Sequence, residues 1–129
     1  MDWRRQARRA LYDYPRLKKK QGETEQQITP VYGGAAVQHS ASRVTENVAL
    51  RSTLTEAEAN IISAVEFAVK MQRYYRNGAE RVRMIELVYF KRTHTIEGAA
   101  EIVHYSTDAL WRWNGEILTA VYVGLKKSR

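Results

Sequence analysis

The sequence predicts an all-α fold: a small helical domain with a C-terminal helix-turn-helix, preceded by a basic N-terminal helix on a polar linker. Apolar residues recur at helical spacing through most of residues 55–125. Capping residues stand where these periodic stretches begin, and the Asn77-Gly78 pair stands where the first of them ends. We therefore expect a basic helical arm over residues 1–21, a linker over 22–54, and a helical domain over 55–129 with the helix-turn-helix at 95–125.

Composition excludes several classes of protein. At 129 residues and 44% hydrophobic content, the chain can bury a core and is too apolar to be disordered throughout. It has no cysteine, which excludes disulfides and thiolate metal sites. No apolar run approaches the length of a membrane span, and no apolar stretch follows the N-terminus as it does in a secretory signal. We expect a protein that folds in a reducing compartment and has no membrane-spanning segment.

The net charge of +7 is unevenly distributed. Residues 1–21 carry eight Lys and Arg against two Asp, residues 22–69 carry two basic against six acidic groups, and residues 70–129 carry eleven against six. Basic segments attract polyanions by releasing condensed counterions, so nucleic acid is the natural partner. A basic surface that only faces solvent remains the alternative.

The first helix is expected over residues 2–13, with an apolar face that runs from Trp3 to Leu11 between arginines. Pro15 is predicted to end or kink it, because proline donates no hydrogen bond and disfavours helical geometry before it. Residues 16–21 can add another basic turn. This helix could clamp DNA phosphates, contact another subunit through Trp3, Leu11 and Tyr14, or only face solvent.

The polar stretch that follows lacks any period, and a long helix begins near Thr55. Thr55 and Glu58 have the spacing of a capping box. The helical pattern continues to residue 75, where Asn77 and Gly78 are predicted to end it in left-handed geometry. A second helix is expected over 79–92, although residues 86–90 could also form a strand.

The informative segment is residues 95–125, which has the pattern of a helix-turn-helix. A short helix is expected at 95–103 and the last helix at 107–125, with the small Ala100 at their crossing and Ser106 or Thr107 as the cap of the second. Apolar residues stand at the offsets that lock the crossing: Val103, Tyr105, Leu110 and Trp113. His104 occupies the turn, where a left-handed backbone usually selects glycine.

The second helix of such a motif enters the major groove through its first turns. The side chains that would face DNA are Ser106, Thr107, Asp108, Trp111 and Arg112. Arg112 can bind guanine through two hydrogen bonds or reach a phosphate, and Trp111 could instead be interior. Contacts to the backbone are expected from residues on either side of the motif: Lys91, Arg92, Thr93, Lys126, Lys127 and Arg129. An αα-hairpin in a plain helical bundle is the structural alternative.

Catalysis is not expected. His39, His94 and His104 have no metal-ligand spacing, so we expect no metal. The sequence shows no Ser/His/Asp cluster, phosphate-binding glycine loop or carboxylate pair, so we expect no enzyme and no cofactor.

Four segments together resemble a known family. They are Leu-Tyr-Asp-Tyr-Pro-Arg-Leu-Lys at 11–18, the Gly33-Gly34 pair, Leu-Val-Tyr-Phe at 87–90, and residues 95–118. They are similar to the late transcription regulators of phages that infect Gram-positive bacteria, the RinA/ArpU-like group, whose helix-turn-helix is of the type found in region 4 of sigma factors. The resemblance implies a phage or prophage activator of late genes, binding double-stranded promoter DNA in the cytoplasm of the bacterial host.

We expect the protein to act as an oligomer, because one short recognition helix rarely binds tightly alone. RNA polymerase is a further candidate partner. Two other functions stay open: a small terminase-like DNA-packaging subunit, and an adaptor that binds polymerase or a sigma factor without binding DNA.

Overall fold

The computed structural model describes residues 2–28 and 54–127, and this part of the chain is all-helical, as predicted. Its elements are α1 (Trp3–Ile28), α3 (Glu56–Arg73), α4 (Gly78–Ile85), the π-helix η3 (Glu86–Phe90), α5 (Ile96–Val103) and α6 (Thr107–Lys127). Residues 29–53 of the expected linker, with His39 and the Gly33-Gly34 pair, lie outside the described residues, as does Arg129.

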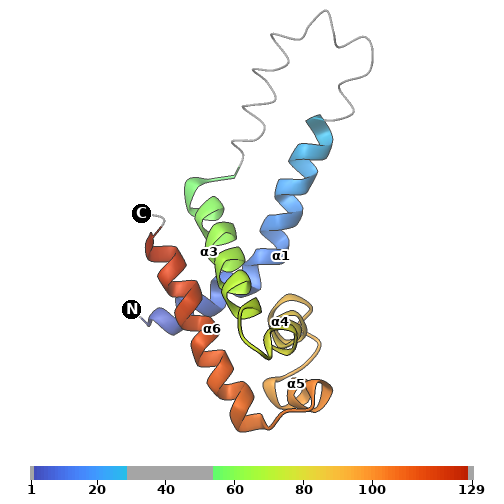
Figure 1. Ribbon diagram of the computed structural model, residues 1–129. Helices are drawn as coiled ribbons and strands as arrows, with labels where there is room; N and C mark the ends of the chain where they lie inside the picture. The colour runs from blue at the N-terminus through green and yellow to red at the C-terminus, as the bar shows by residue number, and fades with distance from the viewer. Residues whose placement is uncertain (1, 29–53, 128–129) are drawn as a thin grey trace, which may run out of the picture.

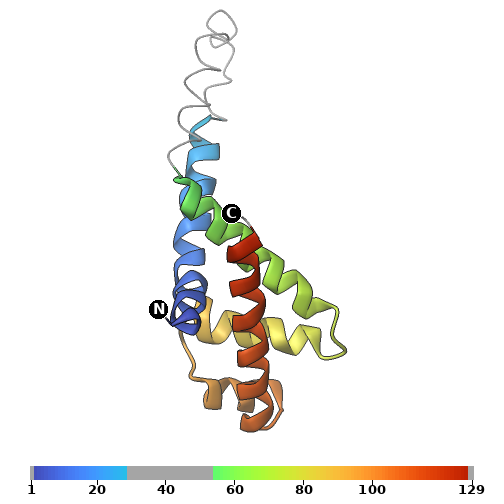
Figure 2. The same ribbon diagram turned by 90° about the vertical axis from the view of Figure 1, so that its left-hand side faces the viewer.

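The long helix α6 organises the fold. It packs along α3 and across α1, while α4, η3 and α5 gather around its N-terminal half (Figures 1 and 2). Its first turns lie beside α5 at one end of the molecule, and its last turns lie near the start of α1 (Figure 1). Because α6 spans the molecule, its side chains connect the core to the helix-turn-helix.

The first helix is longer than predicted. It continues through Pro15 to Ile28, so residues 22–28, expected in the linker, are helical. Pro15 removes the bond to the carbonyl of Leu11 but does not end the helix. Figure 1 shows the helix changing direction between its first half and the remainder, which agrees with the predicted kink.

The first helix is part of the core, not an arm. Ala7 and Leu11 are completely buried. The ring of Trp3 lies 5.5 Å from that of Tyr122, and Tyr14 lies 5.1 Å from Phe90. The apolar face that we considered as a contact to another subunit is therefore occupied within the chain, and the arginines of the outer face meet solvent.

The start of α3 is as predicted. The Thr55 hydroxyl accepts from the backbone N–H of Glu58, and the Glu58 carboxylate accepts from the backbone N–H of Thr55, both at 3.0 Å. That hydrogen bond from the Thr55 backbone is the main cause that lowers the pKa of Glu58. The helix ends at Arg73, close to the expected end.

The break after α3 lies where it was predicted but has another cause. Asn77 has φ −99°, and no described glycine has a positive φ, so the left-handed geometry is absent. A Cβ on Gly78 would instead lie 2.8 Å from the carbonyl oxygens of Gln72 and Arg73. Gly78 is needed because α4 begins directly against the end of α3.

The second predicted helix starts at Gly78 and becomes a π-helix at Glu86, so the strand alternative for residues 86–90 is wrong. Leu87 and Tyr89 are both buried there. After η3, Arg92 takes a left-handed backbone with φ 56°. The backbone N–H of Thr93 donates to the Leu87 carbonyl at 3.0 Å and helps to hold this ending.

A buried arginine ties three helices together. Arg81 of α4 is 5% exposed. It donates to Gln72 of α3 at 3.0 Å, to Glu116 of α6 at 2.5 Å and to Asn77 at 2.9 Å. Its guanidinium also lies 3.8 Å from the ring centre of Tyr75. Because a buried charge needs these partners, they fix the position of α6 relative to α3 and α4.

Candidate nucleic-acid interface

The turn between α5 and α6 has the predicted backbone. His104 has φ 65° and ψ 42°, the left-handed geometry that a helix-turn-helix uses at this position. Thr95 caps α5 by accepting from the N–H of Gly98 at 3.1 Å. Of the two candidate caps for α6, Ser106 performs this role, accepting from the N–H of Ala109 at 3.1 Å.

The crossing of the two helices is locked as expected. Ala100 has a small side chain, which allows α6 to approach closely, and it is only 3% exposed. Leu110 and Trp113 of α6 are buried in the same core. Tyr105 is the exception: it is 40% exposed and packs edge-on against Trp113, with ring centres 4.8 Å apart. The tyrosine covers the rim of this small core.

The first turns of α6 present most of the predicted DNA-facing residues to solvent. Ser106, Asp108, Trp111 and Arg112 are exposed, while Thr107 is half-buried. At 50% exposure, Trp111 is not a core residue. The described part of α1 does not cover this surface.

Lys91, Arg92 and Thr93 are exposed between η3 and α5, but Arg92 is directed elsewhere. Its guanidinium lies 4.4 Å from the ring centre of Tyr12 on α1. Thr93 shares a 2.8 Å hydrogen bond with the ring of His94. The structure therefore associates Arg92 with α1, not with the first turns of α6.

Lys126 and Lys127 lie at the other end of α6. Eighteen residues separate Lys126 from Asp108, a distance of about 27 Å along the helix axis at ~1.5 Å per residue. The two ammonium groups lie over aromatic rings, 5.3 Å from that of Tyr122 and 5.6 Å from that of Phe67. The structure does not bring these lysines together with Arg112.

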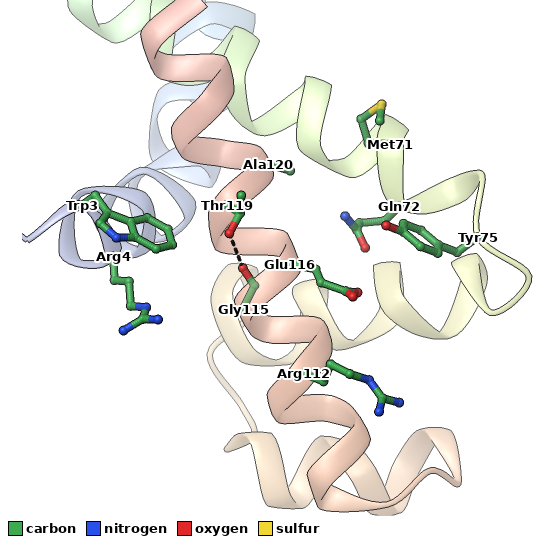
Figure 3. A pocket seen from close by; sticks show the side chains of 10 residues that line it. All are labelled: Trp3, Arg4, Met71, Gln72, Tyr75, Arg112, Gly115, Glu116, Thr119 and Ala120. Atoms are coloured by element: carbon green, nitrogen blue, oxygen red, sulfur yellow. Dashed lines mark hydrogen bonds between the residues drawn. The ribbon is translucent and has the colours of Figure 1, made fainter.

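An open groove extends the exposed face of α6. Its volume is about 510 Å³. Figure 3 shows Trp3 and Arg4 of α1 on one side of α6 and residues of α3 on the other. A Cβ on Gly115 would meet nothing within 4 Å, so the floor of the groove is open, and Arg112 lines one end of it. The sequence does not reveal this groove, because three separate elements form it.

The charge around the motif is mixed. Exposed carboxylates of α5 and α6, at Glu97, Glu101 and Asp108, accompany Arg112. The motif itself is therefore suited to contacts at particular positions more than to general attraction of a polyanion. A separate row of exposed cations lies on α1.

Comparison of the chain with models of known protein families, with curated protein sequences and with solved structures gives no significant match. Among the described residues, no three His, Asp or Glu side chains are grouped as a metal ion would require. In the same ranges, every helix is too short or too polar to traverse a bilayer.

Proposed function

We propose that this protein is a sequence-specific DNA-binding transcriptional regulator that reads the major groove with the first turns of α6. The observation that carries the proposal is the capped, tightly crossed α5–α6 pair, whose left-handed turn at His104 leaves Trp111 and Arg112 free to meet a duplex. In this proposal Ser106 and Thr107 contact phosphates or base edges, and Arg112 binds a guanine.

The family resemblance supports a more specific role. We infer that the protein activates late genes of a phage or prophage in the cytoplasm of a bacterial host, as an oligomer, with RNA polymerase as a further partner. The rigid attachment of α6 through Arg81 supports a direct reading role, because base recognition needs side chains held in a fixed position.

The test is selection of bound sequences from a pool of random DNA duplexes, using the full chain. We expect one sequence to be enriched. The Arg112→Ala variant should bind it about 5- to 150-fold more weakly, since one bidentate contact discriminates by ~1–3 kcal/mol, and should lose preference at one base pair. Lys127→Ala is the matched control, because it removes an exposed cation from the far end of the same helix.

Two outcomes would reject the proposal. If no sequence is enriched and affinity does not fall with salt, the adaptor function is favoured, with Trp111 as the anchor for a protein partner. If Arg112→Ala binds the enriched sequence as well as the unchanged protein, α6 is not the recognition helix. Light scattering of the free protein separates the regulator from a packaging subunit, which should form a ring.

A further inference from the structure

The outer face of α1 carries a row of cations that the proposed function does not use. The exposed basic residues on this face, here called the α1 stripe, are Arg5, Arg8, Arg9, Arg16 and Lys19. The opposite face of the helix, with Ala7, Leu11 and Leu17, is buried against α3, α6 and η3. The α1 stripe therefore faces away from α6.

The cations of α1 are divided by their position. Lys18 and Lys20, on the side toward α3, are paired with Glu66 at 3.0 Å and Glu58 at 3.4 Å. Of the α1 stripe, Arg16 alone has a carboxylate among the described residues within 4.0 Å, that of Asp13. The helix thus compensates the cations that face the domain and leaves the outward ones largely uncompensated.

A second element adds a cation to this surface. Tyr12 lies between the residues of the α1 stripe, and the guanidinium of Arg92 lies 4.4 Å from the centre of its ring. Arg92 holds a left-handed backbone, φ 56°, which a glycine would adopt more easily. Strained positions of this kind are concentrated at functional sites. The arginine at this position brings charge from the end of η3 to α1.

We propose that the α1 stripe, together with Arg92, binds the sugar-phosphate backbone of double-stranded DNA without regard to sequence. The five cations extend over about 21 Å of helix at ~1.5 Å per residue, a length of duplex that presents ~12 phosphate charges at one per ~1.7 Å. A row of long cationic side chains fits an extended polyanion, and the guanidinium of Arg92 lies over the ring of Tyr12, the large apolar side chain on the same face. Because the row faces away from α6, it contacts a duplex segment other than the one under α6.

The test measures binding of the full chain to a random-sequence duplex by fluorescence anisotropy at several salt concentrations. The variant Arg5→Gln/Arg9→Gln/Lys19→Gln removes three stripe cations. The matched control, Lys70→Gln/Arg73→Gln/Arg76→Gln, removes the same charge from exposed positions near the end of α3. We expect the slope of log affinity against log salt to decrease by about 2.7 in the stripe variant, at ~0.9 per phosphate contact, and to change little in the control.

Arg92→Gly tests the contribution of Arg92 and suits the local backbone, because glycine adopts φ 56° without strain. We expect an unchanged or higher melting temperature and a slope smaller by about 0.9. An unchanged slope would overturn the part of the proposal that includes Arg92. Equal losses in the stripe variant and in its control would overturn the whole proposal, because net charge alone would then explain binding.

The proposal goes beyond the reading role of α6, and the two can fail separately. Arg112→Ala should remove the preference at one base pair and leave the salt dependence on random duplex close to that of the unchanged protein. If the stripe variant instead binds random duplex normally, the stripe proposal is rejected whatever α6 does. If poly-glutamate at equal charge competes as strongly as duplex DNA, then DNA is not the partner and an acidic protein is favoured.

Discussion

Among residues 2–28 and 54–127, two residues other than glycine hold a left-handed backbone, and only one was foreseen. His104 was expected to do so because the helix-turn-helix pattern fixes which residue forms the turn. Arg92 was not, because its conformation follows from the ending of η3, and nothing in the local sequence marks a π-helix. Single-residue geometry was predictable where a motif with known spacing defined it.

Gly78 and Gly115 should respond in opposite ways to the same substitution. Gly78→Ala places a Cβ 2.8 Å from two backbone oxygens, which cannot move without shifting α3, so the free energy of unfolding should fall by about 1–3 kcal/mol. Gly115→Ala meets open space within α6 and should raise it by up to ~1 kcal/mol through helix propensity. Urea denaturation measures both. A loss at Gly115 equal to that at Gly78 would refute the close-approach explanation.

Two tyrosines make stability sensitive to alkaline pH. Burial, and then the nearby Tyr12, raise the pKa of Tyr89 to about 12, and burial with the adjacent Glu66 raises the pKa of Tyr14 to about 12, from an ordinary 10.0. A raised folded pKa favours the neutral phenol, so this contribution is complete below pH 10 and is lost as pH rises toward 12. The melting temperature should therefore fall over that interval.

Tyr89→Phe should reduce this fall, because it removes the titrating group that donates to Asn114. Tyr74→Phe is the control, since it removes the same hydroxyl from a side chain that is 77% exposed. Melting curves at a series of pH values measure both. If Tyr74→Phe flattened the dependence as much as Tyr89→Phe, burial would not be its cause.

At the scale of elements, periodicity located the helices from α3 onward well, and local stop signals misplaced the end of α1. Pro15 and Gly22 are typical helix terminators, yet α1 continues because Leu17 is buried and the ion pairs of Lys18 and Lys20 hold the helix against α3. These contacts join residues far apart in sequence. No local pattern reports them, so tertiary packing overrode the propensity.

The sequence predicted which side chains of the candidate interface are exposed as far as it predicted the position of α6. Once α6 was placed, helical offsets put Trp113 inside and Arg112 outside, and the structure agrees. The sequence left the position of Trp111 open, and the structure shows it 50% exposed. The grouping of Lys126 with Arg112 did not follow, because it depended on where α6 ends relative to the rest of the molecule. The groove beside Arg112 depends on α1 and α3 as well.

At the scale of the whole molecule, the basic N-terminal segment is part of the folded unit. Leu11→Ala should lower the free energy of unfolding by about 2–5 kcal/mol, because Leu11 is completely buried and the substitution leaves a cavity. A solvated arm would show almost no change. Lys19→Ala, on the exposed face of the same helix, is the control for altered helix propensity, and denaturant unfolding is the measurement.

The length of α6 has a consequence for any attempt to use its tip alone. Beyond Trp113, the residues Ile117, Leu118 and Val121 are buried, and a Cβ on Gly124 would lie 2.9 Å from the Cα of Ala64. The helix that presents Arg112 in its first turns thus also supplies a large part of the hydrophobic core. A hairpin excised at 95–125 would expose those core residues to water, so the motif cannot be used as a minimal module without α1 and α3.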